Sequence, residues 1–195
     1  KESIIIVSEG LKTMRRINST KIKKLVFKEK IILSSISYKF QKDENYLFKS
    51  STIEIKKGDI IGIIGNSGSG KSTFIDILVG LLKPTNGNIY MDGTKINSKN
   101  KMSYLSNFSV VYQNIYLIDD TILKNIAFGQ TDNDIDKKKA ENCANLVGLG
   151  DVLKKRGGLR SLKNVGERGQ RFSGGQIQRI GLARALYKNS KIIIL

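Results

Sequence analysis

The pattern of apolar and polar positions divides the chain into strand-like and helix-like segments. Apolar and polar residues alternate over residues 31–38, and a second strand is predicted at residues 51–56. Residues 60–64 are almost continuously apolar, as expected for a central strand buried on both faces. Apolar positions over residues 73–82 have helical spacing, and Pro84 blocks continuation of that helix.

The second half of the chain continues the alternation of strands and helices. Glycines punctuate residues 148–169, which predicts a loop-rich stretch. The pattern predicts strands at residues 88–91, 108–112 and 192–195, and helices at residues 120–128, 135–147 and 177–187. Such an order is typical of an α/β fold. Residues 1–30 contain no pattern that would bury a core alone, and we interpret them as a connector.

Composition excludes several kinds of chemistry. The 195 residues are 39% hydrophobic and 26% charged, which is typical of a globular chain of one domain or slightly more. There is no histidine and a single cysteine, Cys143, so a histidine base, an internal disulfide and a cysteine metal site are excluded. We expect Cys143 to be a small, at least half-buried side chain of its helix. No apolar run approaches the ~20 residues of a membrane span, and no signal peptide is evident.

The net charge of +17 is unevenly distributed. Residues 1–57 and residues 131–195 each have a net charge of +8, whereas residues 58–130 have +1. Basic flanks of this kind suit nucleic acid or an anionic membrane surface. A general lysine bias explains the excess equally simply, because 26 of the 34 cationic residues are lysine.

A glycine-rich loop separates the apolar segment 60–64 from the helix that follows it. Residues 65–72 are Gly-Asn-Ser-Gly-Ser-Gly-Lys-Ser and fit the phosphate-loop pattern G-x-x-x-x-G-K-[ST] in full. Glycines let backbone N–H groups converge on phosphate oxygens, and the helix start adds its positive dipole end. Lys71 would contact the β- and γ-phosphates, and the Ser72 hydroxyl would bind Mg²⁺. The predicted nucleotide-binding residues here are Gly65, Asn66, Ser67, Gly68, Ser69, Gly70, Lys71, Ser72 and Thr73.

A second candidate anion site precedes the helix at residues 177–187. The sequence there is Phe172-Ser173-Gly174-Gly175-Gln176, with Ser173 at the expected N-cap position. The two glycines expose backbone N–H groups at the helix start. Taken alone, the same residues also fit an ordinary capped helix after a glycine turn.

Together the motifs resemble the ATP-binding cassette of ABC transporters, over residues 31–195. Residues 172–176 are similar to the family signature, with Phe172 in place of the usual Leu, and residues 178–186 match the family closely. Gln113 resembles the glutamine that contacts Mg²⁺ and senses the membrane partner. Phe40 lies where the family places an aromatic residue that stacks on adenine; Tyr46 fits this role less well. Residues 164–169 resemble the exporter X-loop.

The resemblance implies a fold and an assembly. The expected fold is an α/β P-loop NTPase (RecA-like) core with an antiparallel β subdomain and an α-helical insert at about residues 115–175. Residues 1–30 would be a linker from a transmembrane domain, and residues 31–195 an incomplete ABC ATP-binding domain. Two cassettes would pair head to tail, with Mg²⁺ bound by Ser72 and Gln113. The residues that would contact ATP on the partner cassette are Ser173, Gly174, Gly175 and Gln176.

The resemblance also implies a function. ATP binding and hydrolysis would power export or flipping of a substrate, by acting on transmembrane domains at the cytoplasmic face of the inner membrane. Residues 113–122 are similar to those of bacterial flippases for lipid-linked sugars. One alternative is a soluble ABC-type ATPase acting on nucleic acid or ribosomes, although the spacing from Gly65 to Ser173 is that of a transporter and argues against nucleic acid. Another alternative is a non-hydrolytic ATP-binding partner subunit.

The last residues limit the expected activity. Residues 192–195 resemble the apolar part of the Walker B strand, which in the family precedes an Asp for Mg²⁺ and a Glu that acts as general base. Neither acid is present, nor is the switch histidine. The chain is then either a fragment, which we expect, or a natural cassette that binds ATP without hydrolysing it. We therefore expect no catalytic residue and negligible ATP hydrolysis within residues 1–195.

Overall fold

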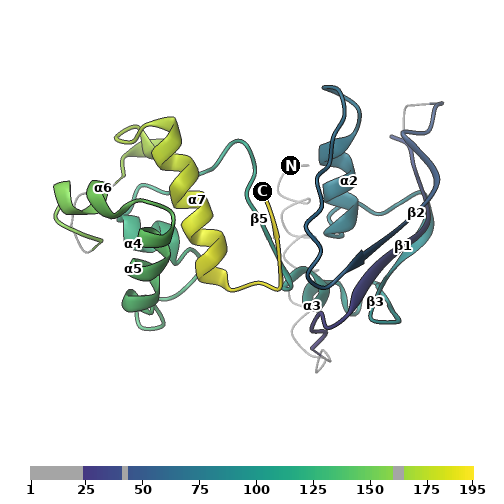
Figure 1. The fold of residues 1–195 in the computed structure, drawn as a ribbon, viewed down its shortest axis with the longest axis horizontal. Coiled ribbons are helices and arrows are strands. Elements are labelled where there is room, and N and C mark those ends of the chain that lie inside the picture. The colour runs from purple at the N-terminus through teal and green to yellow at the C-terminus, as the bar shows by residue number, and fades with distance from the viewer. Residues whose placement is uncertain (1–23, 41–43, 160–164) are drawn as a thin grey trace, which may run out of the picture. The chain divides into compact units, whose positions relative to one another are not determined.

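A computed structural model describes residues 24–40, 44–159 and 165–195 of the chain. These residues belong to two compact units, Lys1–Leu105 and Ser106–Leu195, called here the N-terminal unit and the C-terminal unit. Most of the predicted linker, residues 1–23, lies outside the described residues. Figure 1 shows the sheet and α2 of the N-terminal unit, and the helices around α7 of the C-terminal unit.

An antiparallel sheet forms the N-terminal unit, with strand order β2-β1-β3-β4. Its strands are β1 (Lys30–Tyr38), β2 (Phe48–Lys56), β3 (Asn86–Met91) and β4 (Thr94–Lys95). The strands predicted at residues 31–38, 51–56 and 88–91 are thus confirmed. Ile31 and Met91, which pair across β1 and β3, are fully buried together with Ile77 of α2 (Lys71–Leu78). The second helix of the unit, α3 (Lys101–Leu105), contributes the fully buried Tyr104 and was not predicted.

Asp92, at the turn after β3, forms hydrogen bonds with the backbone at the start of β1. Its carboxylate accepts hydrogen bonds from the backbone N–H groups of Lys28, Glu29 and Lys30, at 2.7, 2.9 and 2.8 Å. Desolvation raises the pKa of Asp92, but these three hydrogen bonds and the nearby charge of Lys28 outweigh it, so the pKa lies below its usual value. The backbone of Asp92 is left-handed, with φ of 49°, as this turn requires.

The buried strand predicted at residues 60–64 is not present, and that prediction is wrong for this structure. The segment forms no strand, and the side chains of Ile60 and Ile64 are 101% and 97% exposed. An apolar run indicates a tendency to be buried, but a strand also needs a neighbour that accepts and donates its backbone hydrogen bonds. The four strands of the N-terminal sheet do not supply that neighbour to this segment.

Five helices and a two-stranded parallel sheet form the described part of the C-terminal unit. The helices are α4 (Ile122–Ile126), α5 (Lys137–Leu146), α6 (Gly150–Lys155), the 3₁₀ helix η2 (Glu167–Gly169) and α7 (Gly174–Lys188). The strands are β5 (Phe108–Val110) and β6 (Ile192–Ile194). The helices predicted at residues 120–128, 135–147 and 177–187 are confirmed, whereas α6 lies within the stretch that the sequence predicts to be loop-rich. Of the strand predicted at residues 192–195, residues 192–194 form β6, and Leu195 after it is 79% exposed.

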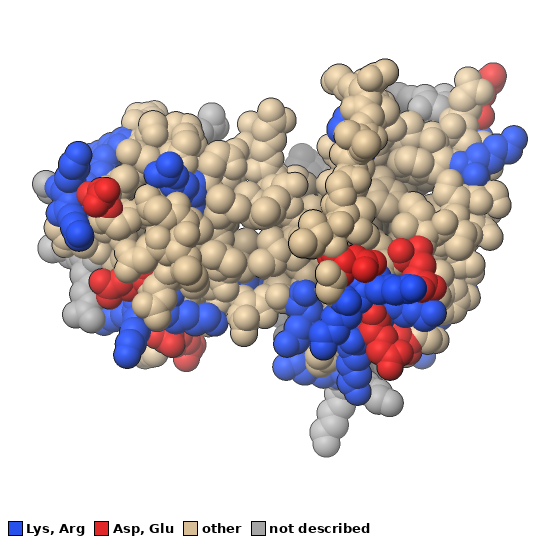
Figure 2. All heavy atoms as spheres, in the orientation of Figure 1, with Lys and Arg blue, Asp and Glu red and all other residues tan. Residues whose placement is uncertain are grey.

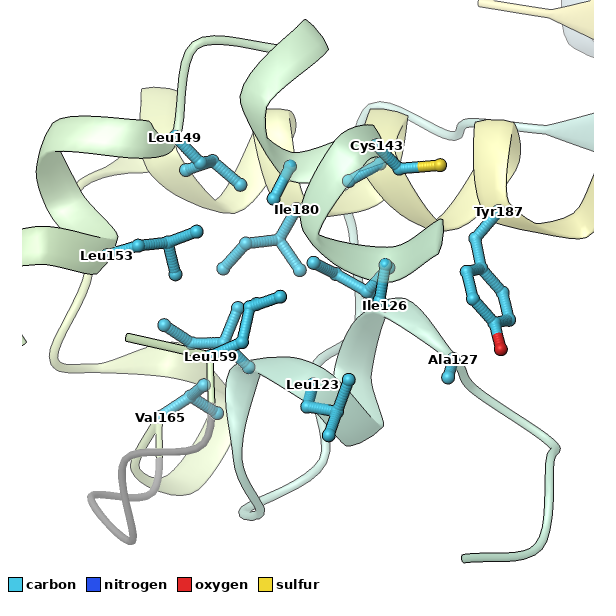
Figure 3. Packing of buried hydrophobic residues seen from close by; sticks show 14 of the residues in the cluster. Leu123, Ile126, Ala127, Cys143, Leu149, Leu153, Leu159, Val165, Ile180 and Tyr187 are labelled. Carbon is cyan, nitrogen blue, oxygen red and sulfur yellow. The ribbon is translucent and has the colours of Figure 1, made fainter. Parts of the chain in front are cut away.

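One apolar core holds the helices of the C-terminal unit together. Ile180 of α7 is completely buried, and Figure 3 shows it among side chains from α4, α5 and α6. Ala140 and Ala144 of α5 are also fully buried, and their small size lets α5 pack closely on α7. Cys143 belongs to this core, as expected, and desolvation raises the pKa of its thiol. Among the described residues, no helix is long and apolar enough to cross a membrane.

Candidate functional site

The phosphate loop of the N-terminal unit ends in a backbone conformation that only glycine adopts easily. Gly70 is the N-cap of α2 with φ of 90°, and a Cβ atom there would lie 2.7 Å from the Leu47 side chain. No side chain caps the first turn of α2. Its N–H groups and the positive end of the helix dipole therefore suit an anion such as phosphate.

Lys71 lies across this loop rather than pointing away from it. Its Nζ donates hydrogen bonds to the carbonyl oxygens of Gly65 and Asn66, at 2.9 and 2.8 Å. An ammonium group has three donor hydrogens, so one is left for a ligand held by the same loop. Ser72 follows in the first turn of α2 and is exposed. Residues 65–73 thus run from an exposed loop into the first turn of α2.

The β1–β2 hairpin contacts the start of α2 and carries the two aromatic candidates for base stacking. Leu47, next to β2, contacts the position of Gly70, and the ring of Phe48 lies 6.1 Å from that of Phe74 on α2. Phe40, the predicted adenine-stacking residue, is 46% exposed and packs edge to face on Tyr38. An exposed aromatic ring of this kind could stack on a base. Tyr46 is similarly exposed, so the structure leaves both aromatic residues as candidates.

Gln113 lies in the C-terminal unit, in the segment that connects β5 to α4. Its side chain is exposed, whereas its backbone carbonyl accepts a hydrogen bond from Nε2 of Gln178 on α7, at 2.8 Å. Among the described residues, no group of three or more acidic or cysteine side chains forms a metal site.

The signature segment forms the start of α7. Ser173 is the N-cap: its Oγ accepts from the Gln176 backbone N–H at 3.3 Å, and Gln176 Oε1 accepts from the Ser173 N–H at 3.1 Å. This reciprocal capping box confirms the predicted cap. Gly174 and Gly175 are exposed, have no positive φ, and a Cβ at either would meet no atom within 4 Å. Packing within the chain therefore does not require glycine at these two positions.

Several contacts around these motifs were not predicted from the sequence. Phe172 is buried, with the Arg156 guanidinium 4.1 Å from its ring centre, and Arg156 also donates to the Arg171 carbonyl. Asn125 of α4 is completely buried and hydrogen-bonds to Arg184 of α7. Burial lowers the pKa of Arg184, although a guanidinium remains charged at neutral pH. Asn164, the first residue of the predicted X-loop, lies outside the described residues.

Comparison with known proteins identifies the family. The family model for ABC transporters matches residues 48–195. The chain is 33% identical over 168 residues to an ATP-dependent lipid A-core flippase of Polaromonas sp. (strain JS666 / ATCC BAA-500), covering 85% of this chain and 27% of that protein. It is 38% identical over 160 residues to the β-(1→2)glucan export ATP-binding/permease protein NdvA of Bartonella bacilliformis, covering 82% of this chain and 26% of that protein.

A solved structure also matches the chain to ABC transporters. A bacterial Atm1-family ABC exporter with ATP bound superposes with a TM-score of 0.78 and 25% sequence identity, over 98% of this chain and 34% of that one. The chain spans only about a quarter of the length of the curated relatives it matches. The family match and the shared α/β architecture confirm the predicted fold class. The chain belongs to the ABC transporter family.

Proposed function

We propose that residues 31–195 are the ATP-binding domain of an ABC exporter, in which ATP binding and hydrolysis power export or flipping of a substrate across a membrane. The observation that carries the proposal is the phosphate loop, where Lys71 lies over loop carbonyls beside an uncapped helix start. The names of the relatives support export as the work that ATP drives. Their named substrates, a lipid A-core and a glucan, are the first substrates to test.

In the proposed ATP site, residues 65–73 surround the phosphates. Backbone N–H groups donate to phosphate oxygens, the Lys71 ammonium neutralises charge on the β- and γ-phosphates, and the α2 dipole adds about 0.3–1 kcal/mol. Ser72 and Gln113 would bind Mg²⁺, which supplies charge neutralisation between the phosphate groups. Phe40, which is 46% exposed, would stack on adenine.

The signature residues are proposed to serve a second cassette. Ser173, Gly174, Gly175 and Gln176 would contact ATP that is bound by the phosphate loop of the partner in a head-to-tail dimer. The openness around Gly174 and Gly175 supports this role, since glycine in a helix costs about 1 kcal/mol relative to alanine and the chain itself gains no packing from it. A phosphate group approaching from outside would use the space that side chains would fill.

The membrane partners follow from the same proposal. The helical subdomain, about residues 115–175, would contact transmembrane domains at the cytoplasmic face of the inner membrane, and residues 1–30 would be the linker to them. The separate apolar core of the C-terminal unit supports treating its helices as one subdomain. On the face shown in Figure 2, acidic side chains lie among the basic ones in each unit, so this face offers no uniformly basic surface to nucleic acid.

Hydrolysis requires residues beyond those proposed for binding. The resemblance implies that the Walker B Asp and Glu follow the strand at residues 192–195. A polypeptide of residues 1–195 alone is therefore expected to bind ATP and to hydrolyse it at a negligible rate. A turnover rate equal to that of the complete exporter would contradict this expectation.

The direct test of the site is Lys71→Ala in the complete exporter. Losing the charged contact to the phosphates should weaken ATP binding about tenfold or more, measured with a fluorescent ATP analogue. Lys83→Ala is the matched control, because Lys83 is an exposed lysine that lies beyond α2. Equal affinities of the Lys71→Ala protein and the wild type would refute the phosphate-loop assignment. Stimulation of ATP hydrolysis by lipid A-core or β-(1→2)glucan would identify the exported substrate.

A further inference from the structure

The segment at residues 113–120 begins at Gln113 and lies against one side of α7. Gln178 Nε2 donates to the Gln113 carbonyl at 2.8 Å, and Arg184 Nη1 donates to the Tyr116 carbonyl at 3.1 Å. Between these two contacts, Gly181 makes room for Ile115, because a Cβ at Gly181 would lie 2.2 Å from Ile115 Cδ1. Residues 178, 181 and 184 are three apart and so form one ridge of the helix.

The same segment is joined to the residues just before the signature. Asp119 Oδ1 accepts from the Gly166 N–H at 3.0 Å, and the Asp120 carbonyl accepts from the Val165 N–H at 3.0 Å. Leu117 is 1% exposed and closes over Gly169, where a Cβ would lie 2.9 Å from Leu117 Cδ1. Segment 113–120 is therefore held both by α7 and by the chain that enters α7.

A buried asparagine and an arginine stabilise this arrangement. Asn125 Oδ1 accepts from the Ile118 N–H at 3.0 Å, and its Nδ2 donates to the carbonyls of Ile118 and Thr121, at 2.9 and 3.0 Å. Arg184 Nε donates to the Asn125 carbonyl at 2.9 Å, and its guanidinium lies 4.9 Å from the Phe128 ring centre. Asn125 thus shapes the segment from within, and Arg184 attaches both to α7.

We propose that Arg184 and Asn125 are positioning residues that make segment 113–120 and α7 one rigid piece. This inference rests on the proposed function, in which Gln113 contacts Mg²⁺–ATP of its own cassette and Ser173 contacts ATP of the partner. This rigid piece then sets the distance between Gln113 and Ser173. A nucleotide that contacts Gln113 therefore fixes the position of the signature segment, residues 172–176. Arg184 contacts no nucleotide in this arrangement and acts through the backbone of Tyr116 and Asn125.

Two substitutions in the complete exporter test the role of Arg184. Arg184→Gln removes the guanidinium group and its charge. Arg184→Lys keeps the charge but cannot donate to the carbonyls of both Tyr116 and Asn125 in the same geometry. Both should lower kcat for ATP hydrolysis about tenfold while KM for ATP and the affinity for a fluorescent ATP analogue stay within about twofold of wild type. Arg179→Gln is the control, since Arg179 also lies on α7 but its guanidinium donates to the Gly148 carbonyl, at 3.1 Å, which is outside segment 113–120.

A pair of compensating substitutions distinguishes a positioning role from a general loss of stability. Gly181→Ala should displace Ile115 while raising the helical propensity of α7, so the fold is kept and kcat falls. Adding Ile115→Ala to Gly181→Ala removes the clash and should restore most of kcat, which a general loss of stability would not do. Wild-type kcat in Arg184→Gln, or no recovery in the double variant, would overturn the inference. An inactive wild type that also fails to bind ATP would overturn the proposed function itself.

Discussion

The two units present their functional residues in different ways. In the N-terminal unit the phosphate loop is held by residues close to it in sequence: Lys71 bonds to Gly65 and Asn66, six and five positions away. In the C-terminal unit Gln113 is held by a distant residue, since Nε2 of Gln178 donates to its carbonyl from 65 positions away. A site held by local contacts can be recognised as a motif, whereas a site held by distant contacts needs the folded chain.

The same contrast appears in how apolar residues are used. In the C-terminal unit, Ile180 is completely buried in a core built from four helices. In the N-terminal unit, Ile60 and Ile64 of an equally apolar segment are almost fully exposed. Hydrophobicity alone therefore does not distinguish these isoleucines, and their burial depends on which elements pack around them.

The largest effect should come from truncating a buried isoleucine. Ile180→Ala leaves a cavity between α7 and its neighbours and should lower the free energy of unfolding by about 2–5 kcal/mol. Ile60→Ala makes the same chemical change at an exposed side chain and should cost less than about 0.5 kcal/mol. Urea unfolding of both variants measures the difference. Equal losses would show that residues 60–64 are buried in solution, as their sequence pattern predicts.

A smaller effect should distinguish the role of Ser173 as a helix cap from its proposed role as a ligand contact. Ser173→Ala removes the capping box of α7 and should cost about 1 kcal/mol of stability. It should leave ATP binding to one cassette unchanged and weaken ATP-driven pairing of two cassettes, measured by sedimentation of the isolated cassette. Asp136→Ala removes the corresponding cap of α5, whose Oδ1 accepts from the Lys139 N–H at 2.9 Å, and should cost similar stability. If both variants weakened pairing equally, Ser173 would be a cap and nothing more.

A further effect, no larger than that of Ser173→Ala, is a pH dependence confined to the N-terminal unit. The folded state lowers the pKa of Asp92, so its contribution to stability is fully present above the unfolded pKa, about 3.9. That contribution is lost as pH falls from there through the lower folded pKa. Asp92→Ala should cost about 1 kcal/mol at pH 7, and the difference from wild type should shrink at pH 3. Asp92→Asn keeps an acceptor for two of the N–H groups and should cost less; a pH-independent difference would contradict the role of the charge.

The elements that depend on near neighbours in the chain are the ones that the sequence predicts correctly. The strands at residues 31–38 and 88–91, the cap at Ser173 and the helix beginning after Gly70 were all predicted, because alternation, capping and loop chemistry involve residues a few positions apart. Helix α6 was missed because flanking glycines indicate a loop, yet Leu153 is buried in the core of the C-terminal unit. Tertiary packing here outweighed a weak local preference.

By itself, therefore, the sequence determined the phosphate loop, the signature segment, the α/β class and the resemblance to the ABC family. Only the tertiary structure decided that Ile60 is exposed, that Phe172 lies against Arg156, and that Arg184 and Asn125 hold segment 113–120 to α7. The physical reason is that motifs are made of adjacent residues whose chemistry is independent of the fold. Burial and side-chain hydrogen bonds to a distant backbone depend on partners that only folding brings together.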